Sequence, residues 1–240
     1  MPVPKPSKGA RRLGFLAAFG AGQAPMLLLA GAISLLAWSW LPTIAIANTT
    51  DEQVCDSKAD YFLGIENFDE TIRLHHKVLK KHPDSALAHY HLGFAYGMMN
   101  DRVAEIKEYR RAAALGLGLW DLFLNMGLAY LQNHDLVEAT KSLRVAVLLG
   151  PDHPESHFNL GLVYERRGML AEAEQETLAS LLLDHNQPDA RNMLAVIYAE
   201  QGENAQALAE WRDLAHDSPD GTAHANLKIL SAILAAPHVQ

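Results

Sequence analysis

Histidine is the residue type with the clearest capacity for metal chemistry in this sequence, which contains 12 of them. The most closely spaced are His75, His76, His89, His91, His153 and His157. Histidines one or two residues apart on a helix point away from each other, so only His153 and His157, four residues apart, are expected to converge. Neither has a nearby cysteine or carboxylate at a recognised ligand spacing. We therefore predict no metal site and no cofactor, and keep metal handling by surface histidines as the alternative.

Catalytic patterns are missing from the sequence. There is no Gly-x-Ser-x-Gly motif and no glycine-rich phosphate loop, and the single cysteine, Cys55, has no credible histidine partner. His89 and His157 stand at the fourth place of the repeats described below, which favours satisfied core or rim histidines over metal ligands. We predict that the protein is not an enzyme and has no catalytic residues.

The charge distribution argues against nucleic acid as a partner. Four of the 20 Lys and Arg residues lie within the first 47 residues, which contain no acid, so 16 bases and all 28 acids belong to the rest of the chain. The rest therefore carries a formal charge of −12. Such a body lacks the basic surface that neutralises phosphates.

The N-terminal segment 1–47 has the features of an export leader. Four basic residues precede an uncharged stretch from Leu13 to Ala47, and Ala45-Ile46-Ala47 has the small-x-small pattern of a signal-peptidase site. Alternatively, residues 24–47 are long enough to remain as a membrane anchor with the basic end in the cytoplasm. Both alternatives predict an extracytoplasmic, periplasmic body, either soluble after cleavage near Ala47 or in contact with the membrane only through this segment. Residues 48–51 form a short linker.

From residue 52 onward the sequence repeats every 34 residues, with units at 52–85, 86–119, 120–153, 154–187 and 188–221. A large-small-large trio recurs at the seventh, eighth and eleventh places of the units, as in Leu92, Gly93 and Tyr96; Met126, Gly127 and Tyr130; Leu160, Gly161 and Tyr164; and Leu194, Ala195 and Tyr198. Small residues allow two helices to approach closely, while large neighbours fill the space beside the contact. Gly168 and Gly202 mark bends, and Pro83, Pro151 and Pro219 close units. Each unit is predicted to be an antiparallel helical hairpin.

Leu160-Gly161-x-x-Tyr164, Gly168, Ala173 and the closing prolines resemble the tetratricopeptide repeat family over residues 52–221. The resemblance implies an all-α, right-handed superhelical solenoid of helix hairpins. Residues 222–240 are expected to form a capping helix and tail, because Leu227, Leu230 and Leu234 share one side of a helix with Ile229 and Ile233. This wide apolar side also keeps self-association open.

The resemblance implies a concave groove lined by the first helix of each hairpin, which binds a protein or peptide. The groove residues expected from this are Tyr90, His91, Phe94, Met98, Leu124, Asn125, Leu128, Leu131, Phe158, Asn159, Leu162, Asn192, Met193 and Val196. They are mainly apolar, with Asn125 and Asn159 at the same place of successive units. The predicted function is a cell-envelope scaffold or assembly factor that binds a mainly hydrophobic peptide or helix, with a homo-oligomer as a further expectation.

Overall fold

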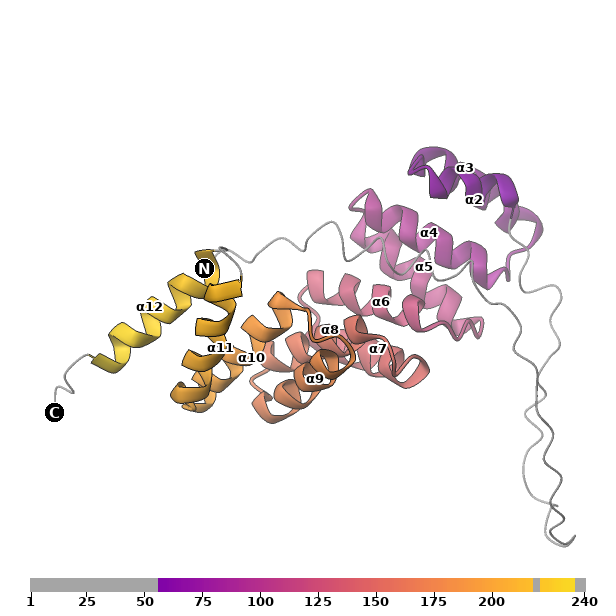
Figure 1. Ribbon diagram of the computed structural model, residues 1–240. Helices are drawn as coiled ribbons and strands as arrows, with labels where there is room; N and C mark the ends of the chain where they lie inside the picture. Colours follow the sequence, from indigo (N-terminus) through magenta and orange to yellow (C-terminus); the bar gives the residue numbers. More distant parts are fainter. Residues whose placement is uncertain (1–55, 218–220, 236–240) are drawn as a thin grey trace, which may run out of the picture. The chain divides into compact units, whose positions relative to one another are not determined.

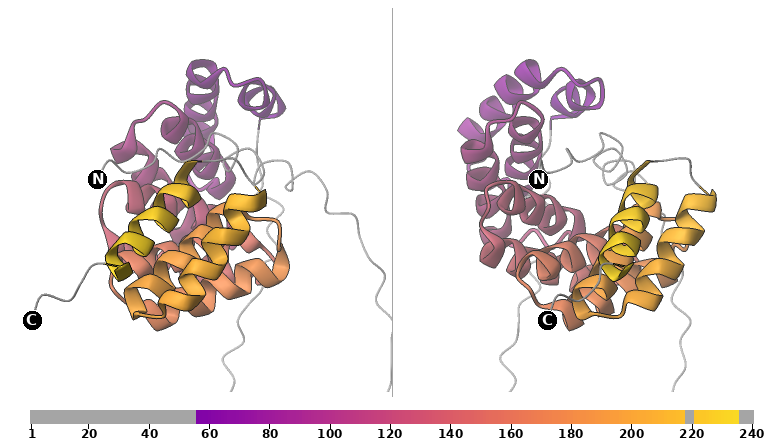
Figure 2. Two further views of the ribbon diagram at one scale, coloured as in Figure 1. Left: turned by 60° about the vertical axis from the view of Figure 1, so that its left-hand side comes forward. Right: turned by 90° about the vertical axis from the view of Figure 1, so that its left-hand side faces the viewer.

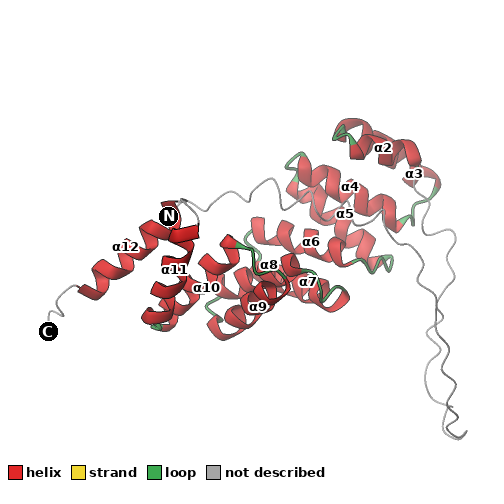
Figure 3. Cartoon of the chain, in the orientation of Figure 1, coloured by secondary structure: helices red, strands yellow, loops and turns green. Residues whose placement is uncertain are grey.

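The computed structural model describes residues 56–217 and 221–235, which belong to one compact unit, Asp51–Gln240. These described residues form α-helices and no strand (Figures 1 and 3). The helices are α2 (Ser57–Gly64), α3 (Phe68–Lys81), α4 (Ala86–Met98), α5 (Arg102–Ala114), α6 (Trp120–Gln132), α7 (Leu136–Leu149), α8 (Pro154–Arg166), α9 (Leu170–Leu183), α10 (Pro188–Gln201), α11 (Asn204–Asp217) and α12 (Gly221–Ala235). The all-helical class is as predicted.

The predicted leader 1–47, the linker 48–51, Cys55 and Pro219 lie outside the described residues. Among the residues that are described, no helix combines the length and the apolar character that a membrane crossing requires.

Helices α2 to α11 form five hairpins that follow one another along the chain, each packed against the next (Figure 2). The first helices of the second to fifth hairpins begin at Ala86, Trp120, Pro154 and Pro188, each the first residue of a 34-residue unit. Pro154 and Pro188 stand in the first turn, where the missing amide hydrogen would have had no helical partner. The period of the sequence is thus the period of the helices.

The bend inside every hairpin has the same backbone conformation. Its fifteenth place has a positive φ in all five units, at Glu66 (61°), Asn100 (64°), His134 (61°), Gly168 (71°) and Gly202 (84°). The backbone amide of the following residue then donates to the carbonyl oxygen five residues earlier, as the amide of Met169 does to Tyr164 at 2.9 Å. In the first three units that next residue also caps the second helix: Asn67, Asp101 and Asp135 each accept a hydrogen bond from an amide three residues on.

Small residues lie where the two helices of a hairpin meet. A Cβ atom added to Gly93 would be 2.5 Å from the Tyr109 ring, and one added to Gly127 would be 2.6 Å from Cγ of Leu143. Both contacts are shorter than side chains tolerate, so glycine is required for this approach. This confirms the expectation drawn from the large-small-large trio.

The first helices of successive hairpins lie closer to one another than the second helices do. Helices α2, α4, α6, α8 and α10 contact their neighbours in this series directly, and the corresponding second helices do so less. We call the surface along these five helices the first-helix surface, and the one along α3, α5, α7, α9 and α11 the second-helix surface. After the last hairpin, Ala223 and Leu230 of α12 pack against Trp211 and Leu214 of α11.

Candidate functional site

The ninth place of four successive units forms an apolar line along the first-helix surface. Its residues are Phe94, Leu128, Leu162 and Val196, one each from α4, α6, α8 and α10, and all four are half-buried. Leu128 and Leu162 use their buried side to pack on the central hydrophobic core, and Val196 packs on the C-terminal one. The remaining part of each side chain is accessible to solvent and available to a ligand.

The predicted groove residues fall into three groups by exposure. Tyr90, Leu124, Leu131 and Met193 are buried in the core between the helices. The half-buried group consists of His91, Phe94, Asn125, Leu128, Phe158, Asn159, Leu162, Asn192 and Val196. Met98 alone among the predicted residues is exposed. The accessible part of the predicted groove is therefore narrower than the sequence pattern indicated.

Tyr90 has a structural partner in the next hairpin. Its hydroxyl donates to Oδ2 of Asp121 at 2.8 Å and accepts from the amide nitrogen of Asn125 at 3.3 Å. Burial and the nearby Asp121 carboxylate raise the pKa of Tyr90 well above its ordinary value, so the phenol is neutral. Burial also raises the pKa of Asp121, although the hydrogen bonds from Tyr90 and from the Leu122 amide oppose that shift. This cluster joins α4 to α6.

Two further asparagines of the predicted groove also make internal hydrogen bonds. Asn159 donates to the carbonyl oxygen of Glu155 at 2.7 Å. Asn192 accepts from Nε1 of Trp211 at 2.9 Å and from Asn226 at 3.2 Å, so it joins α10 to α11 and α12. A carboxamide carries two N–H donors and an oxygen that accepts twice, so Asn125 and Asn159, with one bond each described above, retain bonding capacity.

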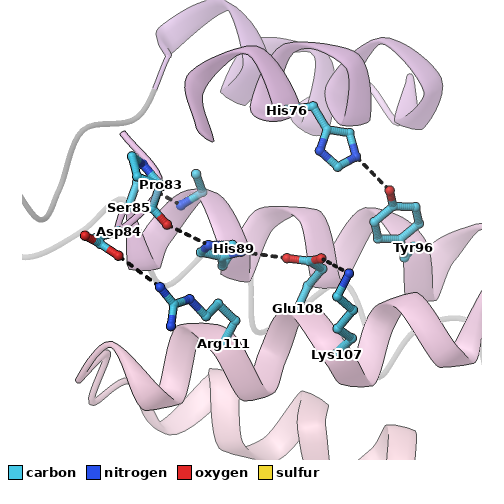
Figure 4. A network of polar contacts seen from close by, with 10 residues as sticks. His76, Pro83, Asp84, Ser85, His89, Tyr96, Lys107, Glu108 and Arg111 are labelled. Carbon is cyan, nitrogen blue, oxygen red and sulfur yellow. Dashed lines mark hydrogen bonds and ion pairs between the residues drawn. The ribbon is translucent and has the colours of Figure 1, made fainter. Parts of the chain in front are cut away.

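His89 and His157 are structural residues with identical surroundings two repeats apart. In each, Nδ1 meets a glutamate of the second helix, Glu108 at 2.6 Å and Glu176 at 2.7 Å. Nε2 of His89 meets the carbonyl oxygen of Pro83 at 3.2 Å (Figure 4), and Nε2 of His157 meets that of Pro151 at 3.1 Å. Burial raises the pKa of Glu108, but the hydrogen bond and charge of His89 outweigh it and lower the pKa overall. The expectation of satisfied packing histidines is confirmed.

His153 and His157, the pair that the sequence spacing favoured for metal binding, contact different residues. His157 is held by Glu176 and the Pro151 carbonyl, and the His153 ring stacks on Trp120 with 3.6 Å between ring centroids. The expectation that no other histidines converge is wrong, because the His75 and His91 rings lie 5.2 Å apart. They come from different helices, so spacing within one helix gave no signal of their approach.

A shallow groove on the second-helix surface is lined by Arg102, Lys107, Arg110 and Arg111 of α5. Three of these bases pair with acids: Arg102 with Glu105, Arg111 with Asp84 at 2.9 Å, and Lys107 with Glu108 at 4.0 Å. Because its charges are largely neutralised locally, this groove is a weaker candidate for a ligand than the first-helix surface.

Five tandem helix hairpins with the same bend between their two helices, and with accessible apolar side chains at one repeated place, define a helical-repeat protein of the solenoid class. Residues 124–191 match the model of the tetratricopeptide repeat family. Residues 124–191 therefore belong to the tetratricopeptide repeat family. No curated protein matches its sequence.

Several solved structures share the fold. YrrB, described as a TPR protein with an unusual peptide-binding site, has a TM-score of 0.68 and 23% identity, over 72% of this chain and 89% of its own. A MamA structure has a TM-score of 0.63 and 20% identity, over 68% of this chain and 89% of its own. PilF of Pseudomonas aeruginosa has a TM-score of 0.62 and 23% identity, over 74% of this chain and 82% of its own. At these identities the likeness establishes the fold alone.

Proposed function

We propose that this protein is a non-catalytic scaffold that binds a mainly hydrophobic polypeptide segment along its first-helix surface. The observation that carries this proposal is the line formed by Phe94, Leu128, Leu162 and Val196, which are half-buried at one repeated place. A half-buried apolar line of this kind favours a partner that contributes apolar side chains at regular intervals. The peptide-binding site named for YrrB, a structure with the same fold, supports a peptide as the ligand.

The asparagines beside this line suit an extended peptide. Asn125 and Asn159 stand at the sixth place of successive units, three residues before Leu128 and Leu162. A carboxamide can donate to a peptide carbonyl and accept from a peptide amide. The repeated asparagines would therefore hydrogen-bond the backbone of the ligand, while the apolar line contacts its side chains. Their internal bonds to Tyr90 and Glu155 orient the two amide groups.

Two of the twelve histidines, His89 and His157, support the non-catalytic part of the proposal. His89 and His157 both bind a glutamate and a proline carbonyl, which uses both ring nitrogens for structure. A catalytic histidine needs one nitrogen available to the substrate. His89 and His157 therefore stabilise the hairpins and are not available as catalytic bases.

We also propose that the repeat body acts outside the cytoplasm, exported by the leader 1–47. The uncharged stretch Leu13–Ala47 supports this, with either cleavage near Ala47 or retention of residues 24–47 as an anchor. Mass spectrometry of the intact chain isolated from the envelope separates the two forms by the mass of the leader. A full-length chain confined to the soluble cytoplasm would contradict export.

The binding proposal is tested with matched pairs of substitutions on the two surfaces. Random peptides displayed on phage are selected on the purified chain, and their affinities are measured for a Phe94→Gln, Leu128→Gln variant. We expect selected peptides rich in Leu and Phe, with affinity at least tenfold lower for this variant, or about 1.4 kcal/mol. The reason is that both side chains lose apolar contact with the ligand.

The matched control is a Val103→Gln, Val137→Gln variant on the second-helix surface. Both valines stand at the eighteenth place of the same two units and are 82% and 54% exposed. The control should bind the peptides within about twofold of the unsubstituted chain, since a twofold change is only a few tenths of a kcal/mol. Equal affinity for both variants, or a loss only in the control, would remove the first-helix surface as the binding site. Circular dichroism must show unchanged helicity in both.

A further inference from the structure

Three metal-ligating side chains meet between the first two hairpins. Asp60 belongs to α2, His75 to α3 and His91 to α4. Oδ1 of Asp60 lies 3.0 Å from Nδ1 of His91 and 4.0 Å from Nε2 of His75, and one ligand atom from each residue lies within 4.8 Å of the other two. The two imidazole rings are 5.2 Å apart.

His75 is a buried polar residue whose ring nitrogens have no hydrogen-bond partner, which packing does not explain. Its side chain is completely buried. An unsatisfied buried polar group destabilises a fold by about 1–3 kcal/mol.

The other two side chains give the cluster access to solvent. His91 is 12% exposed and Asp60 is 25% exposed. A small ion can therefore reach a position between a buried imidazole and a partly exposed carboxylate. Access of this kind is what a binding site requires and a sealed core does not provide.

The repeats themselves supply an internal comparison. Asp60 stands at the ninth place and His75 at the twenty-fourth place of the first unit, and His91 stands at the sixth place of the second. The equivalent sets along the chain are Phe94, Tyr109 and Asn125; Leu128, Leu143 and Asn159; and Leu162, Thr177 and Met193. None of these sets offers a His, Cys, Asp or Glu. Among these sets, only the one between the first and second hairpins consists of metal-ligating side chains. The equivalent places of later units show that the packing of the repeats does not require such residues there.

We propose that Asp60, His75 and His91 bind one divalent transition-metal ion, with Zn²⁺ as the best fit. Two imidazoles and one carboxylate are a ligand set that suits zinc and disfavours Mg²⁺ and Ca²⁺, which prefer oxygen ligands. Bonds of about 2.0–2.2 Å in a tetrahedral site place ligand atoms about 3.3–3.6 Å apart. The Asp60–His91 and Asp60–His75 distances of 3.0 and 4.0 Å lie on either side of that range, and all three ligand atoms lie within 4.8 Å of one another, so side-chain rotations would bring them to bonding positions around one ion. A fourth position remains for water.

Binding would link three helices through one shared ion, in addition to the Asp60–His91 contact between α2 and α4 and the His76–Tyr96 hydrogen bond between α3 and α4. The ion would hold α2 against α3 within the first hairpin and against α4 of the second, at the N-terminal end of the first-helix surface. The bond from Nε2 of His75 to the ion would also satisfy one of its two unpaired nitrogens. The site would therefore stabilise the first hairpin through a ligand that only the folded chain binds.

The test uses the purified full chain, with any histidine tag removed, treated with a chelator and then dialysed free of it. Zn²⁺ is titrated calorimetrically, and the zinc content after dialysis is measured by elemental analysis. We expect one high-affinity ion per chain and a higher melting temperature with zinc. Bound Co²⁺ should show the visible absorption of a four-coordinate site. A stoichiometry well below one, or binding without thermal stabilisation, would overturn the proposal.

Conservative substitutions then locate the site. Asp60→Asn and His91→Gln remove ligands at partly exposed positions and should each weaken zinc binding on the order of 100-fold, since even residues that only orient ligands matter 10- to 100-fold. His75→Leu matches Leu143 of the third unit and should abolish binding while the core stays filled. The controls His89→Gln and His157→Gln should keep the affinity of the unsubstituted chain. Unchanged binding in Asp60→Asn and His91→Gln, or an equal loss in the controls, would refute this assignment.

Discussion

Gly93, Gly127 and Gly161 occupy the same place in successive units, yet each meets a different side chain. A Cβ on Gly93 would lie 2.5 and 2.6 Å from two Tyr109 ring carbons, whereas one on Gly161 would lie 2.9 Å from Oγ1 of Thr177. Tyr109 is fully buried and packs against the Tyr90 ring at 6.0 Å, so it cannot move aside. The tolerance for a methyl group at this place depends on the partner across the hairpin.

This difference predicts the outcome of Gly93→Ala and Gly161→Ala. Alanine in a helix gains about 1 kcal/mol over glycine, but overpacking against a rigid ring costs about 1–3 kcal/mol. We expect Gly93→Ala to lower the urea midpoint more than Gly161→Ala, because the added Cβ meets two ring carbons at 2.5 and 2.6 Å at Gly93 and a single hydroxyl oxygen at 2.9 Å at Gly161. The urea unfolding midpoints of the two variants and the unsubstituted chain are compared under one condition. A larger loss for Gly161→Ala would show that the Tyr109 contact is more adaptable than its burial indicates.

The metal-site residues show the limit of reasoning from neighbouring positions. Asp60, His75 and His91 are 15 and 16 residues apart, so no short motif contains them. The 34-residue register places Asp60 on a first helix and His75 on the second helix of the same hairpin, but their approach to His91 depends on how two hairpins pack. A comparison of equivalent places across units would have marked them, because the equivalent sets of the later units contain no His, Cys, Asp or Glu.

The bends of the hairpins are more uniform in structure than in sequence. Glycine marks only two of the five positive-φ positions, Gly168 and Gly202, while Glu66, Asn100 and His134 adopt the same left-handed conformation. A non-glycine residue pays roughly 1 kcal/mol there, asparagine less than most. The packing of the two helices on either side imposes the conformation. Glycine therefore indicated two of the bends in the sequence, and the other three could be located only from the 34-residue period.

Reciprocal substitutions at this place in adjacent units should have opposite effects. His134→Gly relieves the left-handed strain and should raise stability by about 0.5–1 kcal/mol, whereas Gly168→Ala introduces it and should lower stability by about 1 kcal/mol. An added Cβ at Gly168 has no atom within 4 Å, so its effect is confined to the backbone. Thermal and urea midpoints measure both. Destabilisation by His134→Gly would mean that the His134 side chain contributes a contact that outweighs the strain.

A stack of hairpins leaves an uncovered apolar face at each end, and α12 covers the C-terminal one. Ala223 and Leu230 contact the cluster that contains Ala207, Trp211 and Leu214. Ile229 and Leu234 on the same helix remain exposed, at 54% and 46%. The helix thus uses only part of its wide apolar side for packing on α11.

Deletion of residues 222–240 should uncover Trp211 and Leu214. We expect a lower thermal midpoint, binding of a hydrophobic dye and association at high concentration, because newly exposed apolar surface is buried by contact with another copy. Dye fluorescence and sedimentation velocity measure these effects. As a milder version, Leu230→Ala should destabilise the last hairpin by about 2–3 kcal/mol. If the deletion changes neither stability nor dye binding, α12 does not protect this end of the stack.

The sequence by itself determined the repeat, the helix starts and the small residues at helix crossings. These follow from local chemistry: a fixed 34-residue period places Ala86, Trp120, Pro154 and Pro188 at equivalent helix starts, and close approach demands glycine or alanine. Only the tertiary structure decided which first-helix residues are buried and which are accessible. It also brought Asp60, His75 and His91 together, because the packing of one hairpin on the next sets distances that spacing along a single helix does not contain.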